Sequence, residues 1–384
     1  MKAIYNGLLV LPGQVVTGEV ILYEQDIWKI MPRKAFRAGM CSELIDAQGG
    51  FVFPGFINEH IHGCAGVDTM DGTVEALRTM QKVLPQTGVT SFLPTTMTMS
   101  RKAITTALDA IREAMTEPVE GAQIVGAHME GPFISPAYKG AQAETYIAEP
   151  DFSWIQPYQD IVKIVTVAPE MIHDDAFLRD CEAAHIIVSL GHSNATYEEA
   201  VKVLTAYPYC HSTHLYNAMS PFHHRKPGLV GASLLDRKVR CELICDNLHV
   251  HPAAQKLAYT MKGADGIILI TDSMRAALLP DGTSELGGQT VYVRNGEARL
   301  ADGTLAGSTA AMNDVALHFL INTGATLPEI AQMTAANAAK DLGIFDRVGS
   351  LEEGKQADIV IVDSTDFHVK QTVVAGNLVY SENP

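Results

Sequence analysis

Histidine and carboxylate side chains recur in this sequence at the ends of short apolar runs. They are His60 and His62, Glu130, His192, His214, His249 and Asp272. Nitrogen and oxygen ligands of these types suit zinc or iron and leave room for water. A bound divalent ion can lower the pKa of that water to about 7, which supplies a nucleophile near neutral pH. The pattern therefore indicates a metal site, provided that the fold brings these run ends together.

The pair His60 and His62 has the spacing of two side chains on one face of a strand. Alternate residues of a strand point the same way, so both rings can face one ion while Ile61 packs on the other side. The spacing alone is common, and a single histidine at a strand end is more often structural than ligating. Recurrence at several run ends, together with two carboxylates, is what favours a metal site. We expect structural or surface positions for the remaining candidates, His173, His185, His211 and His318, and a turn position for Asp246.

Eight short apolar runs divide the middle of the chain, and segments with helical periodicity lie between them. The runs cover 51–58, 89–94, 123–128, 161–168, 185–191, 209–214, 240–246 and 266–271. Helical spacing is clearest in 73–87, 100–116 and 195–206. Apolar strands that alternate with helices indicate a parallel sheet covered on both faces. Eight of them predict an α/β fold of the TIM-like (β/α)8 barrel type, in which the carboxyl ends of all strands meet at one mouth.

A doubly wound open sheet is the alternative arrangement of the same elements. Its dinucleotide-binding form is disfavoured, because no G-x-G-x-x-G follows the first predicted β–α turn. A closed barrel, in contrast, brings the polar ends of runs that are far apart in sequence to one place.

Both ends of the chain differ from this middle. Residues 1 to about 50 and 349–384 alternate apolar and polar residues between Gly and Pro positions, which is typical of short strands and turns. Chain termini often lie close together. We therefore predict a small β-sandwich domain built from 1–53 and 346–384, beside a barrel domain over 54–345.

Composition limits the function classes. The 384 residues carry a formal net charge of −16, which lacks the basic footprint of nucleic-acid binding. No apolar run approaches the roughly 20 residues of a membrane span. Six scattered cysteines without a CxxC pair, and an N-terminus without signal-peptide features, favour the cytoplasm. An acidic surface does not exclude an anionic substrate, because a site needs only local positive charge.

Seven short segments give the chain a family resemblance. They are HIHG at 60–63, HMEGPF at 128–133, VAPE at 167–170, GHSNA at 191–195, THLYNAM at 213–219, LHV at 248–250 and TD at 271–272. With them the chain resembles the N-acetylglucosamine-6-phosphate deacetylases, a branch of the amidohydrolase superfamily. The resemblance extends over essentially the whole chain, and GHSNA and THLYNAM are its most specific segments.

The resemblance implies a hydrolase that uses one or two divalent metal ions, zinc or iron, to release acetate from a phosphorylated amino sugar. Glu130, His192 and His214 match the ligands of one ion. In some relatives the HxH pair, here His60 and His62, holds a second ion that the glutamate bridges. This chain keeps the pair, so a second ion is compatible with the sequence.

Further roles follow from the same resemblance. Asp272 matches the catalytic aspartate, which takes a proton from the attacking water and passes it to the leaving amine. The segment Asn217-Ala218 matches a phosphate contact, and His249 matches a contact to sugar hydroxyls. Arg225 matches an arginine that reaches the phosphate from a neighbouring subunit, so the resemblance implies a homodimer.

Three places depart from the relatives. Gln142 occupies a position linked to the substrate's acetyl group where some relatives have histidine, and an amide cannot become cationic. Asn247 stands where many relatives have glycine, and the segment 307–313 also differs. These departures leave the predicted metal chemistry intact but could change the sugar preference.

Three alternatives to deacetylation of N-acetylglucosamine 6-phosphate stay open at this stage. The closest is the N-acetylgalactosamine 6-phosphate counterpart, whose substrate differs at one hydroxyl. Amidohydrolases that bridge their ions with a carboxylated lysine are disfavoured, because Glu130 ends the third run and no lysine stands at an equivalent strand end. An inactive assembly protein is disfavoured as well, because the four candidate histidine ligands and the carboxylates of Glu130 and Asp272 are all present.

Overall fold

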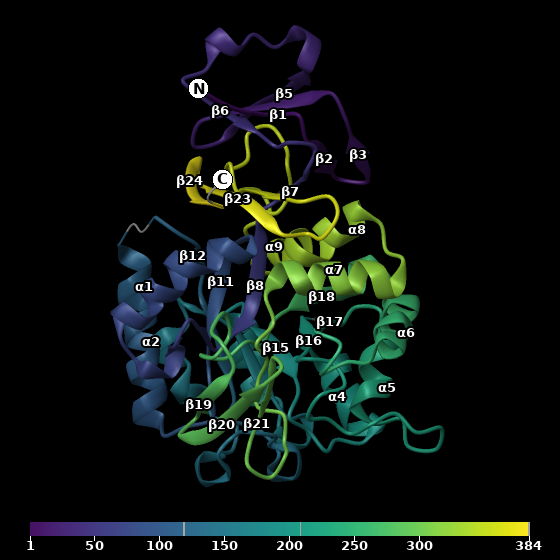
Figure 1. Cartoon of the computed structure of the whole chain (residues 1–384). Coiled ribbons are helices and arrows are strands. Elements are labelled where there is room, and N and C mark those ends of the chain that lie inside the picture. Colours follow the sequence, from purple (N-terminus) through teal and green to yellow (C-terminus); the bar gives the residue numbers. More distant parts are fainter. Residues whose placement is uncertain (118–119, 208, 383–384) are drawn as a thin grey trace.

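Eight parallel strands form the centre of the molecule in the computed structural model, which describes residues 1–117, 120–207 and 209–382 (Figure 1). Each strand pairs in parallel with its neighbours in chain order. The strands are β8 (Phe56–Ile61), β11 (Val89–Thr96), β13 (Ala127–Glu130), β14 (Val162–Val167), β15 (Ile187–Leu190), β16 (Cys210–Ser212), β17 (Arg240–Ile244) and β18 (Ile267–Ile270). The two-residue strand β12 (Gln123–Ile124) precedes β13, and the break between them contains Gly126 with a φ of 149°.

The first and last of these strands meet, so the sheet closes. The Asp272 amide donates to the His60 carbonyl at 3.0 Å, and the Asn58 side chain donates to the Thr271 hydroxyl at 2.8 Å. The predicted (β/α)8 barrel is therefore confirmed, and the doubly wound open sheet is wrong.

Helices surround the barrel strands (Figure 1). They are α1 (Val74–Val83), α2 (Arg101–Thr116), α3 (Ala176–Ala183), α4 (Tyr197–Ala206), α5 (Gly228–Leu235), α6 (Pro252–Lys262), α7 (Met312–Thr323), α8 (Leu327–Ala331) and α9 (Asn337–Asp341). Side-chain caps fix several starts, for example Thr73 on α1 and Ser100 on α2. The α1 segment ends earlier than its periodicity predicts and continues as a 3-10 turn, because Pro85 has no backbone N–H to donate. Within the described residues no helix is long and apolar enough to cross a membrane.

Between β13 and β14 the chain forms short 3-10 turns in place of a regular helix. These turns span Pro136–Tyr138, Glu144–Tyr146, Phe152–Trp154 and Gln156–Tyr158. The segment therefore works as a long loop that starts at the mouth of the barrel, directly after Glu130.

Two sheets from the chain ends pack on each other at one end of the barrel (Figure 1). One contains β5 (Ile27–Pro32), β4 (Glu19–Tyr23), β1 (Lys2–Tyr5) and β6 (Glu43–Asp46). The other contains β24 (Asn377–Ser381), β23 (Val369–Val374), β22 (Ile359–Val362), β7 (Phe51–Pro54), β2 (Leu8–Leu11) and β3 (Gln14–Val16). Apolar side chains of both sheets share one core, which confirms the predicted β-sandwich from both termini. The last two residues of the predicted domain, 383–384, lie outside the described residues.

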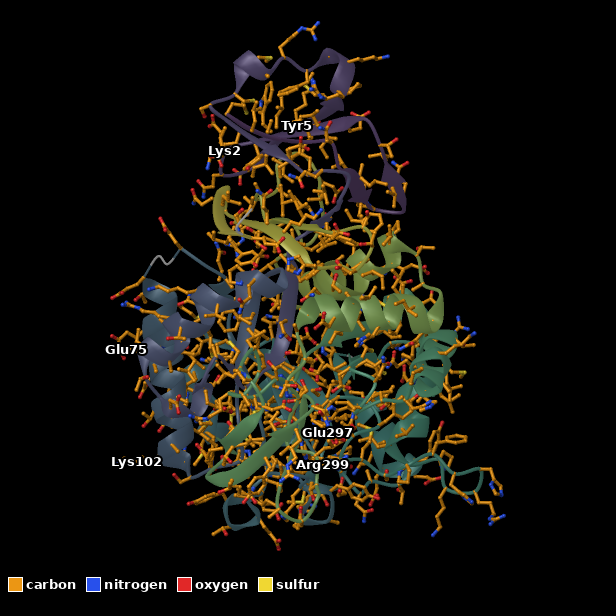
Figure 2. The ribbon with its side chains drawn as sticks, viewed as in Figure 1. Lys2, Tyr5, Glu75, Lys102, Glu297 and Arg299 are labelled. Atoms are coloured by element: carbon orange, nitrogen blue, oxygen red, sulfur yellow. The ribbon has the colours of Figure 1, made fainter. Side chains whose placement is uncertain are left out.

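A three-stranded sheet stands at the opposite end of the barrel and is absent from the sequence prediction. It contains β19 (Gly282–Leu286), β20 (Gln289–Arg294) and β21 (Glu297–Arg299), and Gly287 and Gly288 make its first turn with positive φ angles. Its buried residues pack against Met97 and Met274 of the barrel. Figure 2 shows Glu297 and Arg299 of this sheet far from Lys2 and Tyr5 of the sandwich. The sheet therefore covers the mouth.

Candidate active site

Six of the predicted site residues lie together at the carboxyl ends of the barrel strands, and all six are buried. His60 lies near the end of β8, Glu130 is the last residue of β13, and His62 directly follows β8. The other three stand two positions after the last residues of β15, β16 and β18: His192, His214 and Asp272. Because β8, β13 and β16 are not neighbours in the barrel, contacts among their side chains must cross its mouth. The barrel thus brings side chains that are far apart in sequence together in one cluster.

The Glu130 carboxylate is at the centre of this cluster. Its Oε1 lies 3.0 Å from His192 Nε2, 3.1 Å from His214 Nε2 and 3.5 Å from His60 Nε2. Its Oε2 lies 3.4 Å from His62 Nε2. Burial alone would raise the pKa of this carboxyl, but the surrounding imidazoles, His192 foremost, hold it well below its usual range. Glu130 is therefore a carboxylate in contact with four rings.

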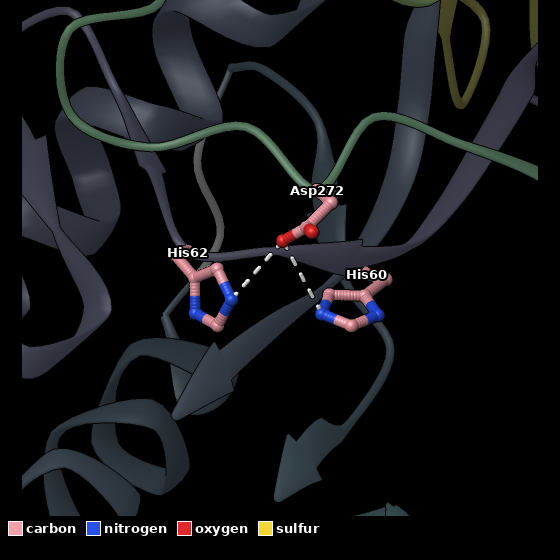
Figure 3. A group of neighbouring side chains, drawn as sticks. All are labelled: His60, His62 and Asp272. Atoms are coloured by element: carbon pink, nitrogen blue, oxygen red, sulfur yellow. Dashed lines mark ion pairs between the residues drawn. The ribbon is translucent and has the colours of Figure 1, made fainter. Parts of the chain in front are cut away.

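Asp272 follows β18 and faces the HxH pair at the end of β8, the strand that β18 meets where the barrel closes. Its Oδ1 lies 3.2 Å from His62 Nε2 and 3.5 Å from His60 Nε2 (Figure 3). Burial would raise the pKa of this carboxyl, yet the two imidazoles lower it to about 2. Asp272 is thus ionised at neutral pH and able to accept a proton.

Backbone conformation aims three of these side chains. His192, His214 and Asp272 all have positive φ, at 47°, 30° and 48°, two positions after the last residue of their strands. This left-handed region costs a residue with a Cβ roughly 1–2 kcal/mol. The chain leaves the strand geometry at each point, so the side chain turns towards the mouth.

Ring orientation tests whether a cation fits the cluster. Nδ1 of His62 lies 3.1 Å from the Thr95 carbonyl and Nδ1 of His192 lies 3.0 Å from the Tyr138 carbonyl. A carbonyl oxygen only accepts, so each Nδ1 carries a proton and each Nε2 is left to face the oxygens of Glu130. Either a second ring proton or a cation between Nε2 and the carboxylate makes this contact favourable.

His60 supports the same conclusion. Its Nδ1 lies 2.8 Å from Glu242 Oε2, and its buried Nε2 has no hydrogen-bond partner in the described part of the chain. Adding protons to every ring would place several buried positive charges against two carboxylates. One or two divalent ions with nitrogen and oxygen ligands fit this donor set more simply. The residues present therefore fit a metal centre.

A pocket opens from the cluster towards the covering sheet. Its lining includes the cluster residues and side chains from the loops around the mouth, among them Met97, Leu286, Thr304 and Leu305. No Lys or Arg stands among the described residues that line it. The described lining of this pocket therefore carries no permanent positive charge.

Four of the five predicted substrate contacts line this pocket: Gln142, Asn217, Ala218 and His249. The His249 ring donates from Nδ1 to Asp246 Oδ2 at 2.6 Å, and Asp246 also accepts two backbone N–H groups of its own turn. Arg225 lies instead on an exposed loop, where its guanidinium contacts His224 at 2.8 Å. The structure thus brings four candidates together and leaves the arginine outside.

Gln142 has both ends of its amide engaged within the protein. Its Nε2 donates to Glu130 Oε2 at 2.5 Å, and its Oε1 accepts the Thr98 backbone N–H at 2.7 Å. The side chain is almost fully buried. Gln142 therefore holds the central carboxylate in place.

Glu242 belongs to the site and is missing from the sequence prediction. Its Oε2 lies 2.8 Å from His60 Nδ1 and accepts the His214 backbone N–H at 3.1 Å. The signal that could have found it is a carboxylate in the middle of the apolar run RCELIC. Burying an ionised group is costly unless it is paired, so such a residue calls for a partner in the barrel interior.

Comparison with known proteins shows the family of the chain. The model of the amidohydrolase family matches residues 51–379. An N-acetylglucosamine-6-phosphate deacetylase of Bacillus subtilis is 46% identical over 339 residues, which cover 86% of this chain and 84% of the relative. An N-acetylgalactosamine-6-phosphate deacetylase of Escherichia coli is 38% identical over 330 residues, covering 85% and 86%.

A solved structure agrees with these sequence matches. The crystal structure of an N-acetylglucosamine-6-phosphate deacetylase from Thermotoga maritima superposes with a TM-score of 0.89 at 36% sequence identity. The match covers 99% of this chain and 100% of that chain. The similarity therefore includes both the barrel and the sandwich.

Proposed function

The chain belongs to the amidohydrolase family, and we propose that it hydrolyses the acetamide of N-acetylglucosamine 6-phosphate to glucosamine 6-phosphate and acetate. The observation that carries the proposal is the Glu130 carboxylate in contact with four imidazoles beneath a pocket. Relatives with the higher identities act, by their names, on the glucosamine substrate. The enzyme is thus a hydrolase of a linear amide bond.

The metal centre has room for one ion or two. Glu130, His192 and His214 would hold one ion, and His60, His62 and Glu130 would hold a second. Zinc and iron both suit these ligands. When bound, the metal supplies Lewis acidity, which polarises the acetamide carbonyl and makes a water molecule acidic.

The protein's own groups move the protons. Asp272 is ionised at neutral pH, so its carboxylate accepts the proton of the attacking water. The same carboxyl then gives this proton to the amine nitrogen, which leaves poorly as an anion. Gln142 borders the acetyl group while its amide stays bonded to Glu130 and Thr98. Met97 and Leu286 form apolar walls that shield the reacting amide from bulk water.

Phosphate recognition requires a second subunit. A sugar phosphate is a dianion, yet no Lys or Arg is present among the described lining residues. Asn217 and Ala218 lie in the pocket and offer backbone contacts, and His249 faces the sugar hydroxyls. Arg225 is exposed on its loop and reaches the pocket of the neighbouring protomer in a homodimer.

Two further parts of the proposal concern the domain boundaries and the cellular location. The division into a sandwich of 1–53 with 346–384 and a barrel of 54–345 follows the strand pairing of β7 with β22 and the start of β8. A cytoplasmic location is supported by six cysteines that are all free, five of them buried.

The test is acetate release by purified protein of known metal content. N-acetylglucosamine 6-phosphate should react much faster than its galactosamine epimer and than unphosphorylated N-acetylglucosamine. Removal of metal with a chelator should abolish turnover, and zinc or iron should restore it. A faster reaction of the epimer would move the assignment to the galactosamine substrate, and no reaction of either sugar phosphate with metal present would refute it.

A further inference from the structure

A second group of buried polar side chains lies inside the barrel, behind the mouth cluster. It consists of Glu59 on β8, His211 on β16 and Glu242 on β17. Strands β8 and β16 are not neighbours, so the contact between Glu59 and His211 crosses the barrel interior. One ligand atom from each residue lies within 4.8 Å of the other two, and none of the three side chains is exposed by more than a few per cent.

Four polar atoms of this group have no hydrogen-bond partner in the described part of the chain. Both oxygens of Glu59, Nδ1 of His211 and Oε1 of Glu242 have no hydrogen-bond partner within the described residues. A buried carboxylate that is neither hydrogen-bonded nor neutralised is costly, and native proteins pair such groups or use them on metals. Four unpaired atoms on three strands therefore indicate a missing partner.

The orientation of His211 indicates what that partner is. Its Nε2 lies 2.9 Å from Asp341 Oδ2 and donates to it. The neutral ring then presents a lone pair at Nδ1, which lies 3.2 Å from Glu59 Oε1. A carboxylate that holds one nitrogen of an imidazole while the other nitrogen faces further anionic ligands is the arrangement found behind metal-binding histidines.

Charge leads to the same conclusion. Glu59, Glu242 and Asp341 bring three carboxyl groups to this part of the barrel, and Arg240, which forms an ion pair with Asp341, brings one guanidinium. With all three carboxyls ionised and the adjoining imidazoles neutral, two negative charges remain uncompensated. A divalent cation neutralises both.

We propose that Glu59, His211 and Glu242 bind a divalent cation inside the barrel, separate from the ions at the mouth. Two carboxylate oxygens and one imidazole nitrogen suit zinc, manganese or iron, whose ligands stand at roughly 2.0–2.2 Å from the ion. The site is enclosed, so its ion enters during folding and exchanges slowly.

The inner ion also has a consequence for catalysis. Glu242 Oε1 has no hydrogen-bond partner within the described residues and is left for the inner ion, while Oε2 lies against His60 Nδ1 and the His214 backbone. An ion that fixes this carboxylate therefore fixes the orientation of one ligand for each of the two proposed mouth positions. The inner ion acts as a structural support of the mouth and touches no substrate.

Metal analysis tests the inner site directly. Protein loaded with zinc is dialysed against a chelator under native conditions, and retained metal per chain is measured before and after unfolding in guanidinium chloride. The wild-type protein should keep about one ion per chain that is released only on unfolding. Glu59→Gln, which keeps the shape but removes the charge, should retain about one ion fewer.

Two matched variants locate the retained ion. Asp358→Asn removes a different buried carboxyl, in the sandwich, and should keep the ion. His214→Ala removes a mouth ligand and should also keep it. Equal metal content in the wild type and Glu59→Gln would overturn the site, because a proton shared by Glu59 and His211 would then suffice. Loss of the ion in His214→Ala would assign it to the mouth, and absence of any release from unfolded wild type refutes the proposal even if the Glu59 variant does not fold.

Discussion

The barrel mouth and the terminal β-sandwich both consist of buried residues in or next to strands, but they bury opposite kinds of side chain. The sandwich core contains Leu9, Ile21 and Ile361, which contribute burial of apolar surface alone. The mouth buries four histidines and two carboxylates whose free nitrogen and oxygen atoms converge. The sandwich core thus stabilises the chain, whereas the mouth lowers stability by burying polar groups and forms a site that a cation completes.

This difference predicts whether a substitution should change turnover or stability. A change at the mouth should alter turnover more than stability, because its polar groups are aligned for chemistry. A change in the sandwich core should alter stability and leave turnover per folded molecule unchanged. The following variants test this separation.

Asp272→Asn should have the largest effect on the mouth. The amide cannot accept the proton of the attacking water, so kcat should fall by about 10³-fold, or roughly 4 kcal/mol. Bound metal per chain and the melting temperature should stay close to wild type. Steady-state kinetics on metal-quantified protein measures this, and turnover near the wild-type value would exclude Asp272 as the proton acceptor.

Ile21→Ala tests the opposite side of the comparison. Ile21 is fully buried in the sandwich, and truncating such a side chain costs about 2–5 kcal/mol of unfolding free energy. Denaturant unfolding should show this loss, and Ile21→Val should cost about 1 kcal/mol. Activity per folded molecule should not change. A large drop in kcat in the folded variant would show that the sandwich takes part in positioning the mouth.

Arg225→Ala separates substrate binding from both chemistry and folding. A charge-assisted hydrogen bond contributes about 1.5–3 kcal/mol, so KM for the sugar phosphate should rise by roughly 10- to 100-fold with a smaller change in kcat. Lys226→Ala, on the same exposed loop, is the matched control and should leave KM nearly unchanged. Light scattering should show a dimer for both variants. An unchanged KM in Arg225→Ala would remove this arginine from the phosphate site.

Asp358→Asn probes the exception within the sandwich, a buried carboxyl without a metal. Burial raises the pKa of Asp358 to about 6, partly offset by hydrogen bonds from the Ala375 backbone and Gln356. Because the folded pKa exceeds the unfolded value of about 3.9, the stabilising contribution is complete below pH 4 and is lost as pH rises through 6.

The amide keeps both hydrogen bonds to Oδ1 and cannot ionise. The variant should therefore be more stable than wild type by about 1–2 kcal/mol at pH 8, and this advantage should shrink towards pH 5. Thermal unfolding at both pH values measures it. An advantage that does not depend on pH would show that ionisation of Asp358 is not its cause.

Much of the architecture could be predicted from local patterns. Eight apolar runs separated by helical segments were sufficient for the barrel, because a strand buried on both faces reads as a continuous apolar run. The covering sheet β19–β21 was missed, since its strands are half exposed and resemble a long loop in sequence. Pro85, which is visible in the sequence, explains why α1 ends early. The exact last residue of the helix could not be read from the sequence.

The candidate site was predictable to a similar degree. His60, Glu130 and His214 stand at recurrent run ends, and the structure places them within contact of one another. Glu59 and Glu242 escaped notice because no spacing pattern marks either residue: Glu59 follows the run 51–58, and Glu242 lies within the run 240–246. Whether such a charge faces a partner depends on strands that are distant in sequence.

The amino-acid order was enough to predict the types of ligand, the strands near whose ends they lie and the family to which the chain belongs. The folded structure was needed to show which nitrogen of His62 and His192 faces the cluster, because a backbone carbonyl from another segment fixes each ring. It also decided that Gln142 holds Glu130, and that Glu242 links the mouth to the barrel interior. Residue identity is local, whereas hydrogen-bond direction and charge compensation arise only when distant strands close into one barrel.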